Sequence, residues 1–487
     1  MRKAATSEAA DGARILGRLS AAVLPGYVLL IVLFYFLAGE QLHLRESRGN
    51  MGLPPADSGT VELTAGSTVE QAFTTKIQRL ESVSVQWGTY YRPNAGTILL
   101  ELVDLRNGAV LLSGTFDASA ITEGGLTTLT AEQPIEGLYQ VPLLLKITSP
   151  DCQGGSAASP LMNTQGGLEN GALTLNGAPA AGTLCFIAQG TDYIWTGLHY
   201  WEFAAVGAAA LLAGLFAVWL RIRQGRRSYV INAVIAVKKY RFLIRQLVSR
   251  DFKTKYKRSV LGMFWSFLNP LLTMCVQYFV FSTIFKSDIP NYAVYLLIGI
   301  VAFNFFSEAT GMALSSIVGN AGLITKVYMP KYIYPLTRVM SSVVNLGISL
   351  IPLVIVSLAT GIQFKKSAVL TLFFLCCVII FSLGLGLLLS ASMVFFRDTQ
   401  FLWGVLNMIW MYATPIFYPE SILPENFKII LRINPMYYFL KNARLCILDG
   451  ISPEPAVYMQ CALMALGALA AGALVFRKSQ DRFVLYL

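Results

Sequence analysis

Five cationic side chains crowd into nine residues of this sequence, and they are the groups best suited to do chemistry. The stretch RDFKTKYKR, 250–258, runs directly into the apolar segment SVLGMFWSFLNPLL. Guanidinium and ammonium groups form charge-assisted hydrogen bonds with phosphate oxygens. A basic cluster beside an apolar segment can also anchor a membrane helix and attract anionic lipid. Phosphate binding and topological anchoring therefore both apply to these residues: Arg250, Lys253, Lys255, Lys257 and Arg258.

Signatures of catalysis and of metal binding are scarce in the sequence. Its two histidines are His43 and His199, and no cluster of His or Cys has the spacing of metal ligands. No G-x-x-x-x-G-K-[ST] motif occurs, so the chain has no phosphate-cradling loop of its own. We predict no catalytic residue, no metal site, no cofactor bound by this chain and no nucleic-acid partner.

The composition is that of an integral membrane protein. Of 487 residues, 55% are hydrophobic and 13% are charged, the latter about half the share usual in soluble domains. Residues 221–258 hold thirteen Lys and Arg against one acid, whereas residues 39–198 hold seven cations against fifteen acids. This asymmetry indicates that the two stretches face opposite sides of a membrane.

Eight segments are apolar and long enough to cross a bilayer as helices, which takes roughly 20 residues each. With the basic stretch inside, the positive-inside rule puts both termini, 1–18 and 477–487, in the cytoplasm. Residues 39–198 then lie outside the plasma membrane. A secretory signal peptide is the alternative for the first segment, but its apolar run exceeds the usual 7–15 residues or so. The eight segments are 19–38, 199–222, 261–286, 292–316, 336–359, 368–394, 401–418 and 456–476.

Residues 39–198 have the pattern of an antiparallel β-sandwich. In SVSVQW, 82–87, apolar and polar residues alternate with the period of two that is typical of a half-buried strand. Asn107-Gly108 lies between two apolar runs and indicates a hairpin. Further turns are expected at Asn170-Gly171 and Asn176-Gly177. We therefore predict an α-helical polytopic membrane protein with an inserted extracytoplasmic antiparallel β-sandwich domain.

The chain has seven cysteines, of which only Cys152 and Cys185 fall within residues 39–198. On the oxidising side of the membrane these two could form a disulfide, and two thiols are the alternative. The other five lie in or near predicted spans and are most simply apolar filling.

Residues 228–258 form a predicted basic amphipathic helix. From Tyr240, apolar side chains recur at i+3, i+4 and i+7, and basic side chains occupy the opposite face. This pattern is typical of a helix that lies in the membrane interface.

Several motifs together resemble one family, the ABC-2 type permeases that export O-antigen, capsule and teichoic acid polysaccharides. RDFKTKYKRSVLGMFWSFLNPLL resembles the gate helix and first span of these permeases. FFSEATGMALSSIVGNAGLITKVYMPKYIYPL resembles the second span and its cytoplasmic coupling turn, and FFRDTQ resembles the turn between the fourth and fifth spans. ATPIFYPESIL and INPMYYFLKNARLCILDG resemble the outer re-entrant region. The resemblance covers about residues 228–487, with a six-span core at 259–476.

The resemblance implies a transport subunit rather than an enzyme. A homodimer of this chain would work among membrane lipids with two ATPase subunits, which bind ATP and Mg, and would move a lipid-linked glycan outward. The basic helix, 250–258, would be the gate for the carrier lipid's pyrophosphate, with the topological anchor as the alternative. A coupling segment would dock into the ATPase subunit, with an ordinary interhelical loop as the alternative. The coupling residues are Lys326, Val327, Tyr328, Met329, Pro330 and Lys331.

Four residues of the predicted core are candidates for the translocation path. Trp410, Tyr412 and Tyr418 could give sugars a stacking surface, as the resemblance implies, although such rings also gather at bilayer interfaces. Glu308 lies within a predicted span, where a charge is costly and usually marks function. A structural partner for Glu308, such as Asn304 or Asn320, is the alternative.

The first 222 residues lie outside the family pattern. Residues 39–198 loosely resemble the jelly-roll sandwiches of carbohydrate-binding modules. Trp87, Tyr90, Tyr91 and Arg92 could stack on sugar rings there, since aromatic faces suit the C–H surface of a pyranose. Seven cations against fifteen acids oppose a strongly anionic ligand. The alternative is a cap that shields the exit or braces the dimer.

Two other functions remain open at this point. One is export of a small hydrophobic compound or lipid by an ABC-2 transporter. The other is a membrane-anchored protein whose β domain binds or modifies glycans and whose spans only anchor it. The number of spans and the coupling-type turn favour transport of a lipid-linked polysaccharide.

Overall fold

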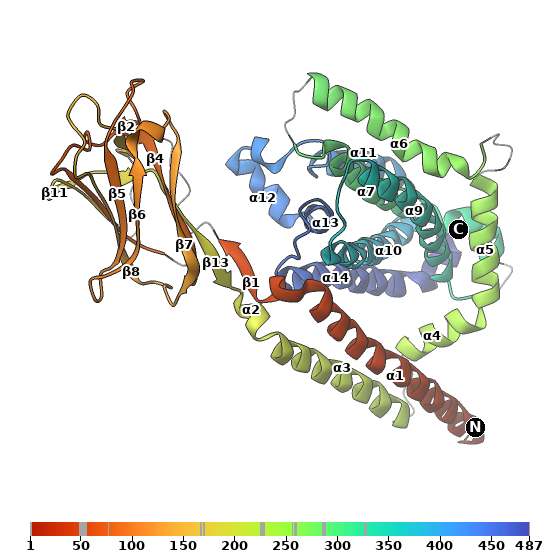
Figure 1. Ribbon diagram of the computed structural model, residues 1–487. Helices are drawn as coiled ribbons and strands as arrows, with labels where there is room; N and C mark the ends of the chain where they lie inside the picture. Colours follow the sequence, from red (N-terminus) through yellow and green to blue (C-terminus); the bar gives the residue numbers. More distant parts are fainter. Residues whose placement is uncertain are drawn as a thin grey trace. The chain divides into compact units, whose positions relative to one another are not determined.

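The computed structural model describes residues 2–47, 56–75, 77–165, 168, 171–224, 229–255, 257, 261–284, 289–325 and 329–486. Contacts divide the chain into two compact units. The helical unit comprises Met1–Gln41 and His199–Leu487, and the β unit comprises Leu42–Leu198. Figure 1 shows the helices of the first and the strands of the second.

The helical unit is built from long apolar helices linked by short 3₁₀ or π-helical turns. The helices are α1 (Arg2–Ala38), α3 (Tyr200–Arg223), α4 (Tyr229–Lys239), α5 (Arg241–Lys255), α6 (Phe264–Tyr278), α7 (Tyr292–Leu314), α8 (Ala321–Ile324), α9 (Ile333–Ala359), α10 (Thr371–Phe395), α11 (Thr399–Tyr412), α12 (Glu425–Ile433), α13 (Pro435–Arg444), α14 (Pro455–Ser479) and α15 (Phe483–Tyr486). The turns are η1 (Gly39–Leu42), η3 (Phe279–Ile284), η4 (Val318–Asn320), η5 (Lys366–Leu370), η6 (Glu420–Ile422), η7 (Leu445–Asp449) and η8 (Gln480–Arg482).

Seven segments among the described residues are long and apolar enough to cross a membrane, so the chain is a multi-pass membrane protein. The segment predicted at 401–418 is not among them, because α11 has only 14 residues and reaches about 21 Å at 1.5 Å per residue. The chain leaves the helix at Ala413, and Pro415 lacks the N–H that a further turn would need. The seven are Ala13–Leu42, Tyr200–Arg223, Phe264–Ser282, Tyr292–Leu314, Ile333–Ala359, Lys366–Phe395 and Pro455–Tyr486.

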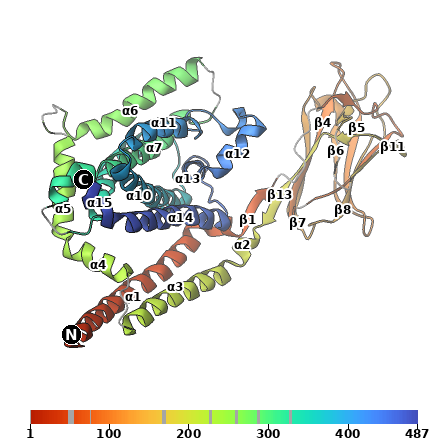
Figure 2. The same cartoon turned by 180° about the vertical axis from the view of Figure 1, so that it is seen from behind.

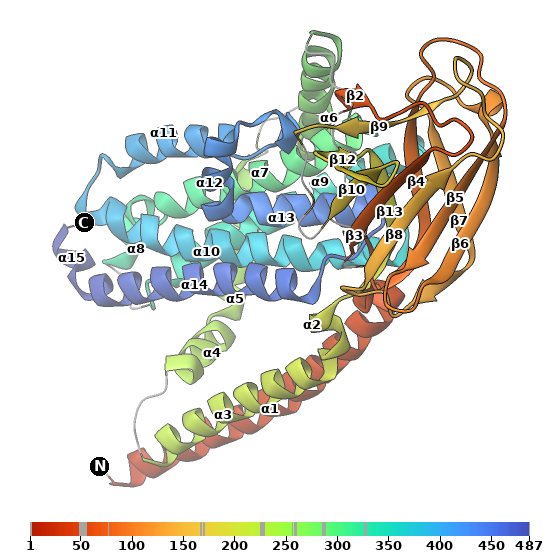
Figure 3. The ribbon, with the colours of Figure 1, turned by 90° about the vertical axis from the view of Figure 1, so that its left-hand side faces the viewer.

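Helices α10 and α14 approach each other backbone to backbone. A Cβ atom at Gly472 would lie 1.9 Å from the carbonyl oxygen of Gly384, and one at Gly384 would lie 2.4 Å from the backbone nitrogen of Leu469. Only glycine allows so close an approach. Figure 3 shows α10, α13 and α14 running side by side.

The two helices that precede the family-like region pair with each other. The Tyr27 hydroxyl donates to the Ala204 carbonyl at 2.7 Å, and the Tyr200 hydroxyl donates to the Ile31 carbonyl at 2.9 Å. Figure 2 shows α1 and α3 running together along their length. Because each hydroxyl satisfies a backbone carbonyl of the other helix, the pair is held by polar bonds within an apolar surface.

The end of α1 is fastened to the core of the helical unit. The Gln41 amide donates to the Gly450 carbonyl at 3.2 Å and accepts from the Ser452 backbone nitrogen at 2.7 Å. The Phe34 ring meets the Tyr458 ring edge-on, with centroids 4.7 Å apart. One side chain thus pairs with both a donor and an acceptor of the backbone that follows α13.

The β unit consists of two antiparallel sheets, as the alternating pattern predicts. One has the order β1-β13-β4-β9-β12, with β7 paired to β4 and β2 to β9, and the other has the order β11-β10-β3-β8-β5-β6. A single apolar core lies between them and includes Phe73, Trp87 and Phe186. The strands are β1 (Leu44–Ser47), β2 (Ser58–Gly59), β3 (Thr68–Thr74), β4 (Arg79–Gly88), β5 (Thr97–Asp104), β6 (Ala109–Asp117), β7 (Leu126–Glu136), β8 (Pro142–Thr148), β9 (Ser159–Asn163), β10 (Ala172–Leu175), β11 (Ala178–Ala180), β12 (Thr183–Leu184) and β13 (Phe186–Tyr193), with a 3₁₀ turn η2 (Ala118–Ala120) and a short helix α2 (Trp195–Leu198).

The predicted turns follow from their residues. Asn176 and Gly177 both have positive φ, at 51° and 80°, and join β10 to β11 in the two-residue geometry that Asn-Gly favours. Asp104 accepts bonds from Arg106 at the hairpin between β5 and β6, and this lowers the pKa of the Asp104 carboxyl. Asn170 lies outside the described residues, so the turn predicted there stays a prediction.

The two cysteines of the β unit are thiols in the structure, the second of the two alternatives that the sequence left open. The Cys152 sulfur lies 3.7 Å from the Thr97 carbonyl oxygen, beside the close turn at Gly96. Cys185 is fully buried where β12 meets β13, and burial raises the pKa of its thiol to about 11. Each sulfur is therefore packed in its own part of the core.

The contact between α10 and α14 gives the first prediction. Gly472→Ala should destabilise the protein by about 1–3 kcal/mol, because the new methyl group meets rigid backbone. Gly467→Ala is the matched control on the same helix, since its Cβ would meet nothing within 4 Å. Heating with a thiol-reactive dye reports unfolding through the buried Cys377 and Cys461. Equal midpoints for the two variants would contradict the close approach.

Candidate functional site

A polar pocket of about 640 Å³ is formed by α5, α7, α9 and the turn after α7. It contains three cationic and two acidic side chains and is open to the outside, since Arg250 and Lys255 are 50% and 42% exposed. Such a cluster can bind an anion only if its charges can be rearranged around it. The lining residues are Arg250, Asp251, Thr254, Lys255, Glu308, Met312, Gly319, Asn320 and Arg338.

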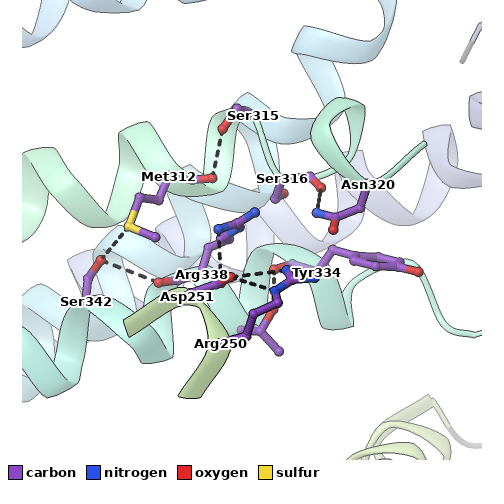
Figure 4. A network of polar contacts seen from close by, with 10 residues as sticks. Arg250, Asp251, Met312, Ser315, Ser316, Asn320, Tyr334, Arg338 and Ser342 are labelled. Atoms are coloured by element: carbon purple, nitrogen blue, oxygen red, sulfur yellow. Dashed lines mark hydrogen bonds and ion pairs between the residues drawn. The ribbon is translucent and has the colours of Figure 1, made fainter. Parts of the chain in front are cut away.

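Asp251 is the centre of one half of this pocket. Its carboxylate is 5% exposed and lies 3.1 Å from Arg250 Nη2 and 3.0 Å from Arg338 Nη1. Figure 4 shows the two guanidinium groups on either side of the carboxylate, one from α5 and one from α9. A buried carboxylate needs such partners, so Asp251 ties the basic helix to α9.

Glu308 is the centre of the other half. Its Oε1 atom accepts from Lys255 Nζ at 2.9 Å and from the Asn345 amide at 2.6 Å. Glu308 therefore has structural partners, as the alternative to a functional role expected, but they are Lys255 and Asn345 rather than Asn304 or Asn320. The carboxylate on α7 thus joins α5 and α9, as Asp251 does from α5.

The apolar stripe of the basic helix packs onto the protein's own helices, and its predicted place in the membrane interface stays a prediction. Tyr240, Leu243 and Ile244 contact a cluster of buried residues from the turn after α7, from α9 and from α15. The helix predicted over 228–258 is also divided, into α4 and α5 on either side of Tyr240. Packing against protein orients the basic face of α5 toward the pocket.

The five residues predicted for the gate do not act as one group. Arg250 and Lys255 line the pocket, whereas Lys253 and Lys257 are exposed and do not line it. Arg258 lies outside the described residues. The pocket instead takes its third cation from Arg338, which the sequence analysis missed. A cation within a predicted span was the available signal.

The described part of the predicted coupling segment is held by this chain itself. Met329 is buried in the cluster around α9, and Lys331 donates to the Gln480 carbonyl and lies 5.7 Å from the Phe483 ring. Pro330 is half-buried between them. Lys326, Val327 and Tyr328 lie outside the described residues, so their role stays a prediction.

The residues predicted for the translocation path lie in separate places. Glu308 belongs to the polar pocket. The Trp410 indole donates to Asn434 Oδ1 at 2.7 Å, and its ring meets Phe306 edge-on. The Tyr418 hydroxyl donates to the carbonyl of Tyr412, whose own side chain is exposed. These aromatic rings mainly order the turn between α11 and α12.

Arg444 organises the irregular chain after α11, and the sequence analysis missed it. Its guanidinium donates to the carbonyls of Pro415 at 2.6 Å, Ile416 at 2.9 Å and Tyr295 at 3.1 Å. It also stacks 3.5 Å from the centroid of the Tyr295 ring. Buried carbonyls without helical partners need such donors, so Arg444 allows the chain to turn back inside the unit.

In the β unit, the residues predicted to bind sugars differ in their exposure to solvent. Trp87 is fully buried in the core, which removes it from any binding surface. Arg92 is engaged with Glu62 at 2.5 Å and lies 4.9 Å over the Tyr90 ring. Tyr91 is 91% exposed, the largest exposed fraction among the aromatic residues named for this unit.

The backbone that carries these tyrosines is strained and braced. Tyr90 and Tyr91 have φ of 56° and 55°, which is uncommon for bulky residues. The Glu123 carboxylate accepts from both the hydroxyl and the backbone nitrogen of Thr89, and these bonds lower the pKa of Glu123. The loop therefore displays an exposed ring on a backbone of uncommon φ, next to a residue that Glu123 holds.

Comparison with known proteins identifies a family match within the helical unit. The ABC-2 type transporter family model matches residues 243–448. The chain is 29% identical over 256 residues to the O-antigen export system permease protein RfbA of Myxococcus xanthus, covering 52% of this chain and 98% of that protein. It is 31% identical over 210 residues to the protein of the same name from Klebsiella pneumoniae, covering 43% and 81%. The polysialic acid transport protein KpsM of Escherichia coli is 22% identical over 246 residues, covering 49% and 93%.

The role of Arg444 gives the second prediction. Arg444→Lys should lower stability by about 2–5 kcal/mol, because an ammonium cannot reach three carbonyls in the planar geometry of a guanidinium. Arg432→Lys, at an exposed position of α12, is the control. Thermal unfolding of the purified protein measures the difference. Equal stability of the two variants would show that the carbonyls do not need Arg444.

Proposed function

Because this chain belongs to the ABC-2 type permeases of polysaccharide export, we propose that it is the transmembrane subunit of an ATP-driven exporter of a lipid-linked polysaccharide. The polysaccharide would be of the O-antigen, capsule or teichoic acid type. It would move outward across the plasma membrane, attached to its carrier lipid by a pyrophosphate.

The observation that carries this proposal is the cationic pocket on the basic helix. Arg250, Lys255 and Arg338 line one cavity of about 640 Å³ between helices of the membrane unit. Arg and Lys side chains bind phosphate oxygens through charge-assisted hydrogen bonds. A purely apolar cargo would gain nothing from these groups, so the pocket favours a phosphate-bearing lipid over a small hydrophobic compound.

The energy source would be a separate ATPase subunit. The chain has no phosphate-cradling motif of its own, and ATP with Mg would bind to the partner. Residues 326–331 are the proposed contact with that subunit. Since Met329 and Lys331 are fastened to α9 and to the C-terminal helices, a push on this segment would reach the helices that line the pocket.

The proposed arrangement in the membrane follows the charge distribution. Residues 221–258, with thirteen cations and one acid, would face the cytoplasm together with both termini, and residues 39–198 would lie outside. We propose that two copies of the chain form the transport path, as a homodimer with two ATPase subunits.

Export in reconstituted vesicles gives the third prediction. The triple variant Lys253→Gln, Lys255→Gln and Lys257→Gln, in which Lys255 is the residue that lines the pocket, should slow export of a pyrophosphate-linked glycan about tenfold or more, the loss that corresponds to roughly 1.4 kcal/mol. The chain is reconstituted with its ATPase subunit, and ATP-dependent appearance of glycan in the trans compartment is measured.

The matched control removes three other charges from the same basic stretch, Lys238, Lys239 and Arg241, none of which lines the pocket. This second triple variant should export at the normal rate, and the chain alone should hydrolyse no ATP. Equal export by both triple variants would contradict the gate role and would support the interpretation of the basic stretch as a topological anchor.

We propose a second, separate function for the β unit, the binding of a neutral or zwitterionic glycan. The observation that favours it is the braced loop, which displays Tyr91 at 91% exposure on a strained backbone. Strain that is maintained by a dedicated network is typical of binding loops. Trp87 no longer belongs to this proposal, and Arg92 and Glu62 serve to hold the Tyr90 ring.

Glycan binding by the intact protein gives the fourth prediction. Tyr91→Ala should abolish saturation transfer to an oligosaccharide of the exported polymer, since an aromatic ring supplies the stacking surface. Tyr139→Ala is the control, because Tyr139 is also exposed, at 53%, and also lies beside a residue of positive φ, Gln140. Saturation-transfer NMR at millimolar sugar suits the weak binding expected. Unchanged transfer in Tyr91→Ala would eliminate this loop as the site.

A further inference from the structure

We infer that Asp251 and Glu308 are built-in counter-ions, which occupy the cations of the pocket until a diphosphate displaces them. This inference rests on the proposed function and names how the same site is regulated. In the structure each acid is bound to groups that an incoming anion would use. The carboxylates would therefore set the affinity of the site for a diphosphate. Their displacement would also couple binding to a change in the shape of the site.

The charges of the pocket nearly balance without a ligand. Three cations, Arg250, Lys255 and Arg338, face two carboxylates in one cavity. The Asp251 carboxylate is 5% exposed and shared by two guanidinium groups, at 3.1 and 3.0 Å. The cations are more exposed, at 50% for Arg250, 42% for Lys255 and 24% for Arg338, so the ion pairs serve mainly to stabilise the nearly buried Asp251 carboxylate. An anion that enters must compete with them.

A diphosphate has the chemistry to win this competition. It offers several acceptor oxygens and at least two negative charges, so one molecule can replace two carboxylates. A single carboxylate or a monoester has fewer acceptors for three cationic groups. The cavity of about 640 Å³ has room for such a group beside the side chains that it already holds. The site would thus select by charge number as well as by shape.

Displacement of the two acids would also change which helices are tied together. Asp251 joins α5 to Arg338 on α9. Glu308 joins α7 to Lys255 on α5 and to Asn345 on α9. A diphosphate bound to Arg250, Lys255 and Arg338 would replace these bonds with bonds to itself. The helices around the pocket would then be held by the cargo, so that its arrival and departure are coupled to their position.

The competing explanation is that Asp251 and Glu308 only fasten α5 in place. The two explanations differ in what happens when the negative charge is removed and the shape is kept. If the acid is purely structural, replacing it with the corresponding amide lowers the affinity for a diphosphate or leaves that affinity unchanged. If the acid is a counter-ion, the same replacement frees the cationic donors of the pocket and removes the repulsion between carboxylate and diphosphate. The affinity for a diphosphate then rises.

The test is a titration of the full chain in phosphatidylcholine nanodiscs with inorganic pyrophosphate, followed by calorimetry. Asp251→Asn and Glu308→Gln should each bind pyrophosphate about tenfold or more tightly than the wild type, within the usual range of coupling between sites. Asp251→Glu, which keeps the charge, should stay within about twofold of the wild type. The two acids are tested in separate variants. If one variant fails to fold, the pyrophosphate affinity of the other still tests the inference.

Glu420→Gln is the matched control. Its carboxylate makes an ion pair with Lys441 at the same 2.9 Å distance as Glu308 makes with Lys255, but it does not line this pocket. The affinity of the Glu420→Gln variant for pyrophosphate should equal that of the wild type. A gain of the same size in Glu420→Gln would reflect net charge alone and would overturn the inference.

The remaining outcomes separate the inference from the function on which it rests. If the wild type binds pyrophosphate and the two amide variants bind it equally or more weakly, the counter-ion role is wrong and the proposed gate stands. If no form binds pyrophosphate, the diphosphate site itself is wrong. A polyprenyl diphosphate added to the nanodiscs should compete with pyrophosphate, whereas phosphatidylglycerol should not. Failure of the lipid diphosphate to compete would overturn the assignment of the site to a lipid-linked ligand.

Discussion

The structure of the helical unit depends on one constraint, that a polar or charged group removed from water must find partners inside the protein. Asp251 meets this need with two arginines from different helices, and Arg444 meets it for two backbone carbonyls of an irregular segment and for one of α7. Each solution joins elements that are distant in the sequence. The arrangement of α5, α7 and α9 around the polar pocket, and the return of the chain after α11, both follow from such bonds.

The same constraint bears on the exchange of ion-pair partners that we infer for the polar pocket. The pair between Lys255 and Glu308 is partly exposed, at 42% and 27% of the two side chains, and can be exchanged for equally charged groups at little net difference in free energy. A pocket with nearly matched charges would therefore remain stable through the inferred exchange. Apolar contacts such as those of Tyr240 and Leu243 hold the basic helix during such an exchange, because they do not involve the exchanging groups.

Sequence patterns predicted the elements better than the contacts between them. Apolar length located the spans, and Asn176-Gly177 located a hairpin, because these signals are local. The partners of Glu308 could not be predicted, since Lys255 and Asn345 are 53 and 37 residues away and their meeting depends on helix packing. Trp87 was misassigned because alternation shows that a residue faces one side of a strand, but not whether that side is the core. The short α11 was missed because hydropathy averages over the prolines that end it.

The approach of Gly384 and Gly472 has a mechanical meaning for a transporter. Where two helices touch through backbone atoms, neither can rotate or slide without breaking a contact that has no flexible side chain to absorb the motion. Helices α10 and α14 therefore form a rigid pair within the helical unit. Helices that meet through longer side chains, such as α5 against α9 at the Asp251–Arg338 ion pair, have side-chain torsions that can absorb a small shift. The rigidity of a helix contact thus depends on whether the chain carries glycine or arginine there.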